Sequence, residues 1–193
     1  MSDNNKQQKD SAALEIESME DFLKSVERRA LQMSKIATGD PELAMDLVQD
    51  TMLKLVEKYS SKPPHEWRPL FYRILNNKIT DFYRRNAVKA RLFASHLSIN
   101  DDDRDTSETI VAMAQPVHNP DYKAQSDQRI ERLIKSLSRL PARQQQAFML
   151  RCWEGMNTMQ TAQVMNCSQS SVKTHYSRAL HALRDRLEEY RDD

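Results

Sequence analysis

The sequence predicts an all-α protein of two small helical domains joined by a flexible acidic linker. Only two of the 193 residues are glycine, and 30% are charged. Over most of the chain apolar residues recur at spacings of three and four, which is the period of an amphipathic helix. Two such domains of about 70 residues each lie near the lower limit of independent stability, so a partner is expected to help hold them.

The first two helices are predicted from their apolar stripes and their end signals. The first 18 residues are polar and are expected to be a disordered tail. A helix then begins at Met19, and its apolar stripe comprises Phe22, Val26, Ala30, Met33 and Ala37. It ends at Thr38-Gly39, because Asp40 is a good N-cap and Pro41 suits the first position of a new helix. The second helix is expected to reach about Tyr59, with Ala44, Leu47, Val48, Leu55 and Val56 facing inward.

A third helix is predicted at about residues 66–86, after a Pro-containing loop. Its buried face is expected to comprise Leu70, Phe71, Ile74, Leu75, Ile79 and Phe82. Its other face carries Arg73, Asn77, Lys78, Asp81, Arg84 and Arg85. From about 93 to 125 the helical period is lost, and an Asp run with Pro116 and Pro120 marks a linker. A short helix near residues 109–114 is the one regular element considered within it.

The last quarter of the chain has the plan of a helix-turn-helix. A helix with Ile130, Leu133, Ile134 and Leu137 stops before Pro141, and helix resumes through Phe148, Met149 and Trp153. Asn157 and Gln160 then form a capping box for a short helix. Asn166 can take the left-handed conformation that ends this helix, and Ser168 caps the next one.

The final helix separates an apolar face from a polar one. Its expected inner residues are Val172, Tyr176, Ala179, Leu180 and Leu183. The residues expected to face outward are Ser170, Ser171, Lys173, Thr174 and Arg178. Small hydroxyls and cations on one face suit a helix that lies in a DNA major groove. From this pattern alone, an ordinary amphipathic helical hairpin is the alternative.

Charge is strongly segregated although the net charge is only +1. Residues 65–95 hold seven basic and two acidic residues, and residues 139–186 again hold seven and two. Between these basic segments, residues 100–121 hold six acidic residues and one basic residue. The chain is therefore divided into a tail (1–18), a first domain (19–92), an acidic linker (93–125) and a helix-turn-helix domain (126–190), a layout suited to charged partners.

Several classes of function find no support in the sequence. Cys152 and Cys167 lie in no CxxC pair, so buried reduced thiols are favoured over a metal site or a disulfide. No nucleophile–base constellation or phosphate-binding glycine loop is evident, so neither an enzyme nor a cofactor is expected. The polar start and the lack of a long apolar run predict a cytoplasmic protein with no membrane insertion and no small-molecule substrate.

Two further motifs have both an ordinary and a functional interpretation. Asp46, Gln49 and Asp50 share one exposed helix side, which is most simply a solvated face. On the third helix Trp67, Tyr72 and Tyr83 lie among arginines. If exposed, these three aromatics could bind unstacked bases; packing into the core is the alternative.

Taken together, these segments resemble the sigma-70 family of bacterial RNA polymerase sigma factors. Residues 40–55, with the run Asp46-Leu47-Val48-Gln49-Asp50, resemble region 2. The segment that begins Trp67-Arg68-Pro69 and continues through Asn77 and Asp81 to Arg84-Arg85 resembles the promoter-melting part of that region. Residues 140–187 resemble region 4. Because there is no room for regions 1.1 or 3, the chain is similar to the extracytoplasmic-function (ECF) type.

The resemblance implies a role for each segment. Asp46, Leu47, Gln49 and Asp50 would dock on the β′ coiled coil of the polymerase core, and region 4 would meet the β flap. The residues implied for the −10 element are Trp67, Arg73, Asn77, Lys78, Asp81, Arg84 and Arg85, with residues 62–67 forming the loop that captures a flipped base. The residues implied for the −35 element are Ser168, Ser170, Ser171, Lys173, Thr174 and Arg178. Promoter DNA and the core are the implied partners, and an anti-sigma factor is a further candidate.

Two other functions compete with this interpretation. A helix-turn-helix regulator with an N-terminal interaction domain would explain the last quarter, but it leaves residues 46–50 and 67–85 without a role. A helical adaptor that binds RNA or protein would account for the basic third helix alone. Binding to polymerase core separates the first interpretation from the other two.

Overall fold

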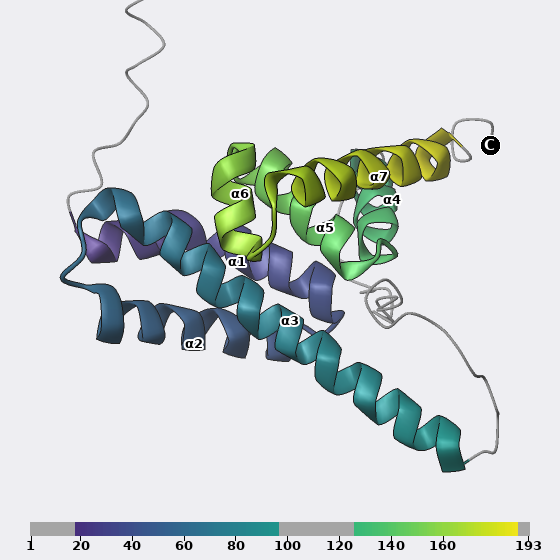
Figure 1. Cartoon of the computed structure of the whole chain (residues 1–193), viewed down its shortest axis with the longest axis horizontal. Coiled ribbons are helices and arrows are strands. Elements are labelled where there is room, and N and C mark those ends of the chain that lie inside the picture. The colour runs from purple at the N-terminus through teal and green to yellow at the C-terminus, as the bar shows by residue number, and fades with distance from the viewer. Residues whose placement is uncertain (1–17, 97–125, 189–193) are drawn as a thin grey trace, which may run out of the picture.

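The computed structural model describes residues 18–96 and 126–188, and every regular element within these ranges is a helix. Side chains are described for residues 18–88 and 129–188. The predicted tail, apart from Ser18, and the predicted helix near 109–114 lie outside the described residues, as does most of the linker. The helices form two groups that pack against each other (Figure 1).

The N-terminal group consists of α1 (Met19–Thr38), α2 (Pro41–Tyr59) and α3 (Pro64–His96). α1 and α2 lie along the first part of α3, whose last turns extend beyond both of them (Figure 1). The Ser18 hydroxyl caps α1 by accepting from the Asp21 amide. The Asp40 carboxylate accepts from the amides of Glu42 and Leu43, so the predicted cap of α2 is confirmed.

The core of this group is built on the predicted stripe of α1. All five of its residues are buried: Phe22, Val26, Ala30, Met33 and Ala37. The ring of Phe22 lies 6.0 Å from the rings of both Trp67 and Phe71, measured between centroids. From α2 the buried residues are Ala44, Val48, Thr51 and Leu55, which recur every three to four positions.

The C-terminal group consists of α4 (Ser126–Ser138), α5 (Ala142–Phe148), a π-helical turn η1 (Met149–Trp153), α6 (Thr158–Met165) and α7 (Gln169–Glu188). The capping box of Asn157 and Gln160 is present in full. Asn166 ends α6 with a φ of 50°, in the left-handed region. The Ser171 amide donates to the Ser168 hydroxyl at the start of α7. The predicted helix-turn-helix is therefore confirmed.

The two groups share one continuous hydrophobic core. α3 packs against α5 and α6, and α1 packs against α4. In Figure 1, α2 lies on the side of α1 and α3 that is away from the C-terminal helices, so α1 and α3 make the contact. This contact joins segments that are far apart in the sequence, so neither group is an isolated unit in this conformation.

The structure corrects several of the sequence-based expectations. α3 begins at Pro64 and runs to His96, so it is longer at both ends than predicted and its last four residues fall in the segment expected to be linker. Val56 and Leu180 are exposed rather than inward, because each lies one position, or about 100°, away from a buried stripe. Cys152 is exposed, whereas a buried thiol was expected, and Cys167 is partly buried; both are free thiols.

Candidate nucleic-acid and polymerase interfaces

The outer face of α2 carries the acidic motif. Asp46, Gln49 and Asp50 are exposed, whereas Leu47 is half-buried and packs against the core. Leu47 thus fixes the helix while the polar side chains face outward. The exposed apolar side chains of Met45, Leu53 and Val56 lie on the same helix. Met45 and Leu53 were not predicted to belong to this surface, although their positions outside the buried stripe of α2 indicated that they are exposed.

One residue of this acidic motif contacts α3 directly. The Asp50 carboxylate accepts a hydrogen bond from the Lys78 ammonium at 2.8 Å. The Asp50 side chain is 62% exposed and that of Lys78 is 25% exposed, so water screens the ion pair. The structure thereby joins a residue assigned to the core interface with one assigned to the −10 interface.

The outward side of α3 presents most of the remaining −10 candidates. Arg73, Asn77, Arg84 and Arg85 are exposed, and Lys78 and Asp81 are half-buried. Arg84 forms an ion pair with Asp81 at 2.9 Å, one helical turn apart. Asn77, Asp81 and Arg84 share one face at i, i+4 and i+7, so they form a continuous polar strip.

The aromatics of α3 do not belong to this strip. Trp67, Tyr72 and Tyr83 are all buried, so the interpretation that exposed them for base stacking is wrong in this conformation. Trp67 packs against Phe22, and the Tyr72 ring meets Phe71 edge-on. Burial raises the pKa of Tyr72, helped by the negative charge of Glu154, and burial alone raises the pKa of Tyr83.

The outer face of α7 presents the −35 candidates. Ser168, Ser170, Lys173, Thr174 and Arg178 are exposed, and Ser171 is half-buried. The Ser168 hydroxyl lies 2.8 Å from the hydroxyls of both Ser170 and Ser171. The Thr174 hydroxyl donates to the Ser170 carbonyl. The hydroxyls are therefore ordered by local hydrogen bonds at the start of the helix.

The opposite face of α7 fixes its orientation. Val172, Ala179 and Leu183 are buried on the side of α7 that packs against α4, α5 and α6. The Tyr176 ring stacks on Phe148 with centroids 6.4 Å apart, and the Arg151 guanidinium lies 5.5 Å from the same ring. The Tyr176 hydroxyl lies 3.2 Å from the Cys152 sulfur, and that hydrogen bond raises the pKa of Tyr176.

A cluster of polar contacts between the two groups was not predicted. The Arg68 guanidinium of α3 donates to both the backbone carbonyl and the carboxylate of Glu154. Further along α3, Tyr83 donates to the Gln145 side chain, and Thr80 accepts from Gln146. The one signal in the sequence was Glu154, an acidic residue in a basic segment.

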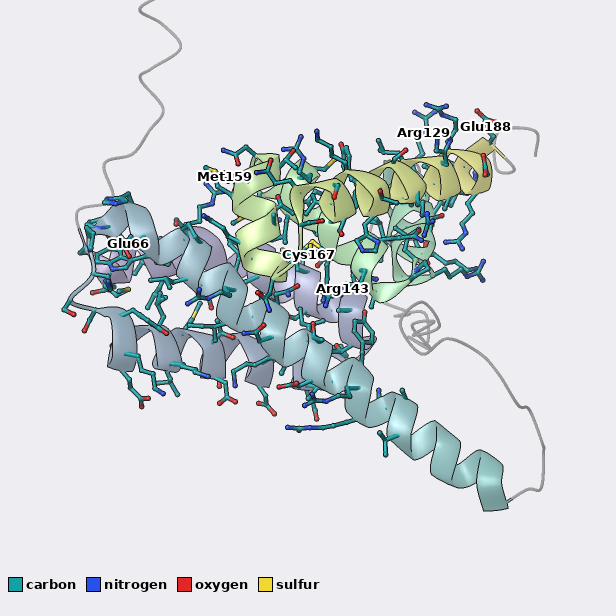
Figure 2. All side chains as sticks on the ribbon, viewed as in Figure 1. Glu66, Arg129, Arg143, Met159, Cys167 and Glu188 are labelled. Carbon is teal, nitrogen blue, oxygen red and sulfur yellow. The ribbon has the colours of Figure 1, made fainter. Side chains whose placement is uncertain are left out.

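Figure 2 shows side chains projecting from all the described helices, with Glu66 near the start of α3 and Met159 on α6. Among the described residues, no cluster of His, Cys, Asp and Glu could hold a metal ion. A search of the same residues finds no helix long and apolar enough to cross a membrane.

Comparison with known proteins identifies both groups of helices. The family model described as Sigma-70 region 2 matches residues 19–88, and the model described as Sigma-70, region 4 matches residues 130–183. A comparison with curated proteins finds no match. Among solved structures, the sigma factor RpoE from Bartonella quintana, in a co-crystal with the anti-sigma factor NepR, is similar with a TM-score of 0.59 and 23% identity. The match covers 88% of this chain and 98% of that one.

These matches define a transcription factor with one region that engages polymerase and opens DNA and a second that reads duplex DNA. The chain belongs to the sigma-70 family of sigma factors. It binds RNA polymerase core and directs promoter recognition. The regulator alternative is not favoured, because the region 2 match accounts for the helices that it left without a role.

Proposed function

We propose that this sigma factor uses three separate helix faces for its three tasks. The supporting observation is that α2, α3 and α7 each expose a polar face while the opposite face is anchored in the shared core. A face held in this way can bind a large partner without a change in the helix itself. The assignment of each face is argued below.

The outer face of α2 docks on the β′ coiled coil of the core through Asp46, Gln49 and Asp50, and through the exposed part of the half-buried Leu47. Two carboxylates and an amide can accept hydrogen bonds from basic side chains of a partner helix. The neighbouring exposed side chains of Leu53 and Val56 supply apolar area to the same contact. Region 4 meets the β flap.

A single charge reversal tests the α2 assignment. Asp46→Arg should weaken binding to polymerase core at least tenfold. It replaces a carboxylate that accepts hydrogen bonds with a guanidinium, which is repelled by the basic side chains of the partner. The free energy of unfolding should change by no more than about 0.5 kcal/mol, since Asp46 is exposed. Affinity is measured by titrating labelled full-length chain with core, and stability is measured by urea denaturation.

The matched control is Glu27→Arg, the same reversal at an exposed position of α1. It should bind core like the wild type. If Asp46→Arg folds normally and keeps wild-type affinity, Asp46 is not part of the core interface.

The polar strip of α3 engages the −10 element during DNA opening. Asn77 and Asp81, with the end of the α2–α3 loop at Lys62 and the first turn of α3 up to Trp67, hold an extruded base, because base extrusion requires contacts that offset the loss of stacking. Arg84 and Arg85 hold the single-strand backbone, and Arg73 and Lys78 add positive charge beside it. Trp67 is buried in the present conformation, so its part in this contact requires a rearrangement.

The exposed start of α7 reads the −35 element. Lys173 and Arg178 contact phosphates, and Ser168, Ser170, Ser171 and Thr174 lie where short hydroxyl side chains meet base edges or backbone in a major groove. Phosphate contacts would set affinity, and the hydroxyls would set sequence preference. The acidic segment 93–125 separates a region 2 domain (19–92) from a region 4 domain (126–190).

The remaining assignments follow from the family. The factor is active in the cytoplasm, where polymerase is, and it has no catalytic reaction or cofactor of its own. An anti-sigma factor is a candidate regulator, because the solved RpoE with which this chain shares its fold is described in complex with the anti-sigma factor NepR.

A further inference from the structure

The turn between α6 and α7 is bound by a side chain from α5. The Arg143 guanidinium donates to the backbone carbonyl of Met165, the last residue of α6, at 2.9 Å. The two residues are 22 positions apart, so this hydrogen bond joins the start of α5 to the end of α6. Because α7 begins at Gln169, the bond lies next to the start of the helix proposed to read the −35 element.

The backbone of this turn leaves the Met165 carbonyl to a side-chain donor. The last carbonyls of an α-helix have no partner within the helix. The amides of Asn166 and Cys167 both donate to the carbonyl of Ala162, so neither serves the carbonyls that follow it. Arg143 supplies a donor for the last of these carbonyls, and its positive charge lies at the negative end of the α6 dipole.

A second observation places Arg143 beside the turn. Figure 2 shows Arg143 and Cys167 close together. Burial raises the pKa of the Cys167 thiol, and the positive charge of Arg143 partly offsets that rise. A charge affects a thiol in this way only nearby, because solvent and salt screen charges separated by more than about 8 Å. Arg143 thus acts on both the end of α6 and the segment that leads into α7.

Arg143 is one of three arginines in this domain that bind backbone within it. Arg151 donates to the Met156 carbonyl at 2.6 Å, and Arg186 donates to the Ser136 carbonyl at 3.0 Å. The positive charge of the domain therefore includes side chains that fix the fold, although charge alone suggested a surface for DNA. Of these three arginines, only Arg143 binds the segment that leads into α7.

The position of the turn matters most for side chains with a short reach. The −35 candidates Ser168, Ser170 and Ser171 directly follow it. A hydroxyl forms a hydrogen bond over about 2.5–3.0 Å, so a shift of the turn by about 1 Å breaks such a contact with a base edge. The long, flexible side chain of Lys173 can follow a phosphate by changing its rotamer. A misplaced turn therefore weakens base discrimination more than attraction to phosphate.

We propose that Arg143 is a positioning residue for the reading of the −35 element, and that it acts through the Met165 carbonyl rather than through DNA. The inference rests on the proposed assignment of α7 to that element. By fixing the turn, Arg143 holds the serine hydroxyls where they meet base edges. It differs in this from Lys173 and Arg178, to which phosphate contacts are assigned, because its acceptor is a protein carbonyl.

The test separates base discrimination from phosphate contact. Holoenzyme is formed from polymerase core and the full-length chain. Its affinity is measured for a promoter fragment that wild-type holoenzyme selects and for the same fragment with a changed −35 sequence. With Arg143→Met, which removes the donor, the ratio of the two affinities should fall about tenfold, the size of one lost base contact. The plot of log affinity against log salt concentration should keep the wild-type slope, because no phosphate contact is lost.

Three variants serve as controls, with circular dichroism to confirm that each is folded. Arg143→Lys keeps a cation and an N–H donor, so it should retain at least half of the wild-type ratio. Arg139→Met, the same change at an exposed arginine before α5, should leave the ratio unchanged. Lys173→Ala should show the opposite pattern, with a slope shallower by about 0.9 unit and an unchanged ratio.

A distance measurement tests the turn without DNA. Spin labels at Gln163→Cys in α6 and Arg184→Cys in α7, both exposed, are introduced into the full-length chain with Cys152→Ser and Cys167→Ser. With Arg143 present, the distance distribution between the labels should be single and narrow. Arg143→Met should broaden or shift it, because the turn loses the hydrogen bond that fixes it.

Each result has a defined meaning. A folded Arg143→Met variant that keeps the wild-type ratio, or identical distance distributions, would overturn the proposal. A kept ratio with a shallower slope would overturn it as well, since Arg143 would then contact phosphate. So would a ratio lost equally in Arg143→Lys, since the retained donor would have no effect. A wild-type holoenzyme that does not distinguish −35 sequences would instead count against the assignment of α7.

Discussion

At the scale of single residues, the polar side chains at the start of α7 are of two kinds. The Ser168 hydroxyl is engaged with Ser170 and Ser171, so a base that approaches them must compete with existing hydrogen bonds. Lys173 and Arg178 instead present long cationic side chains on the exposed face. Hydroxyls held in place favour discrimination between bases, whereas the cations favour sequence-independent attraction to phosphate.

Removal of one cation should change the salt dependence of DNA binding. With Lys173→Ala, the plot of log binding constant against log salt concentration for a −35 duplex should become shallower by about 0.9 unit, because one phosphate contact is lost. Affinity should fall to a similar extent on cognate and unrelated duplexes. Fluorescence anisotropy at several salt concentrations measures both effects.

Lys58→Ala, at an exposed lysine of α2, is the matched control and should leave the slope unchanged. An unchanged slope for Lys173→Ala as well would mean that this side chain does not reach a phosphate.

At the scale of helices, the sequence was informative where the determinants are local. The caps at Asp40 and Asn157 and the left-handed Asn166 were predicted correctly, because each depends on a few neighbouring residues. The stripe of α1 was also correct. The predicted inner faces of α2 and α7 each included one residue that is exposed, Val56 in α2 and Leu180 in α7. Apolar character does not specify burial at the edge of a stripe, where a partner surface decides it.

The polar strip of α3 makes a prediction about DNA opening. Asn77→Ala should slow open-complex formation on a duplex promoter by more than it weakens core binding. A template already unpaired at −10 should recover part of the loss, because the cost of unstacking is removed beforehand. Permanganate reactivity of unpaired thymines reports the opening.

Asn86→Ala provides the control, since Asn86 is exposed nine residues further along α3, on nearly the opposite side. Equal defects of Asn77→Ala on duplex and pre-melted templates would indicate that Asn77 has no role in base capture.

At the scale of the whole molecule, the contact between the two groups could not be derived from the sequence. The burial of Tyr72 and Tyr83 depends on α5 and η1, more than 60 residues later in the chain. Each group alone has a plausible helical pattern, and nothing in either pattern states where the other group lies. The site residues on exposed faces were therefore placed correctly on their helices, whereas the three α3 aromatics, whose burial depends on distant contacts, were not.

The shared core predicts cooperative unfolding. In calorimetry the free wild-type chain should unfold in one transition, with equal calorimetric and van't Hoff enthalpies, because one hydrophobic cluster spans both groups. Glu154→Arg should resolve two transitions, since it places a second cation against Arg68. The swapped pair Arg68→Glu with Glu154→Arg should regain part of the coupling. Two transitions in the wild type would mean that the groups unfold independently.

The π-helical turn η1 changes the direction in which the side chains after it point. Between Phe148 and Glu154 the hydrogen bonding widens, and the Glu154 amide donates to the carbonyl of Met149, five residues earlier. A π turn accommodates one residue more than an α turn. Every side chain that follows is thereby rotated by about 100° relative to an uninterrupted α-helix. The direction in which Glu154 points is thus encoded by residue count as much as by residue type. A one-residue deletion in η1 would turn this carboxylate away from α3, although Glu154 and Arg68 would both still be present.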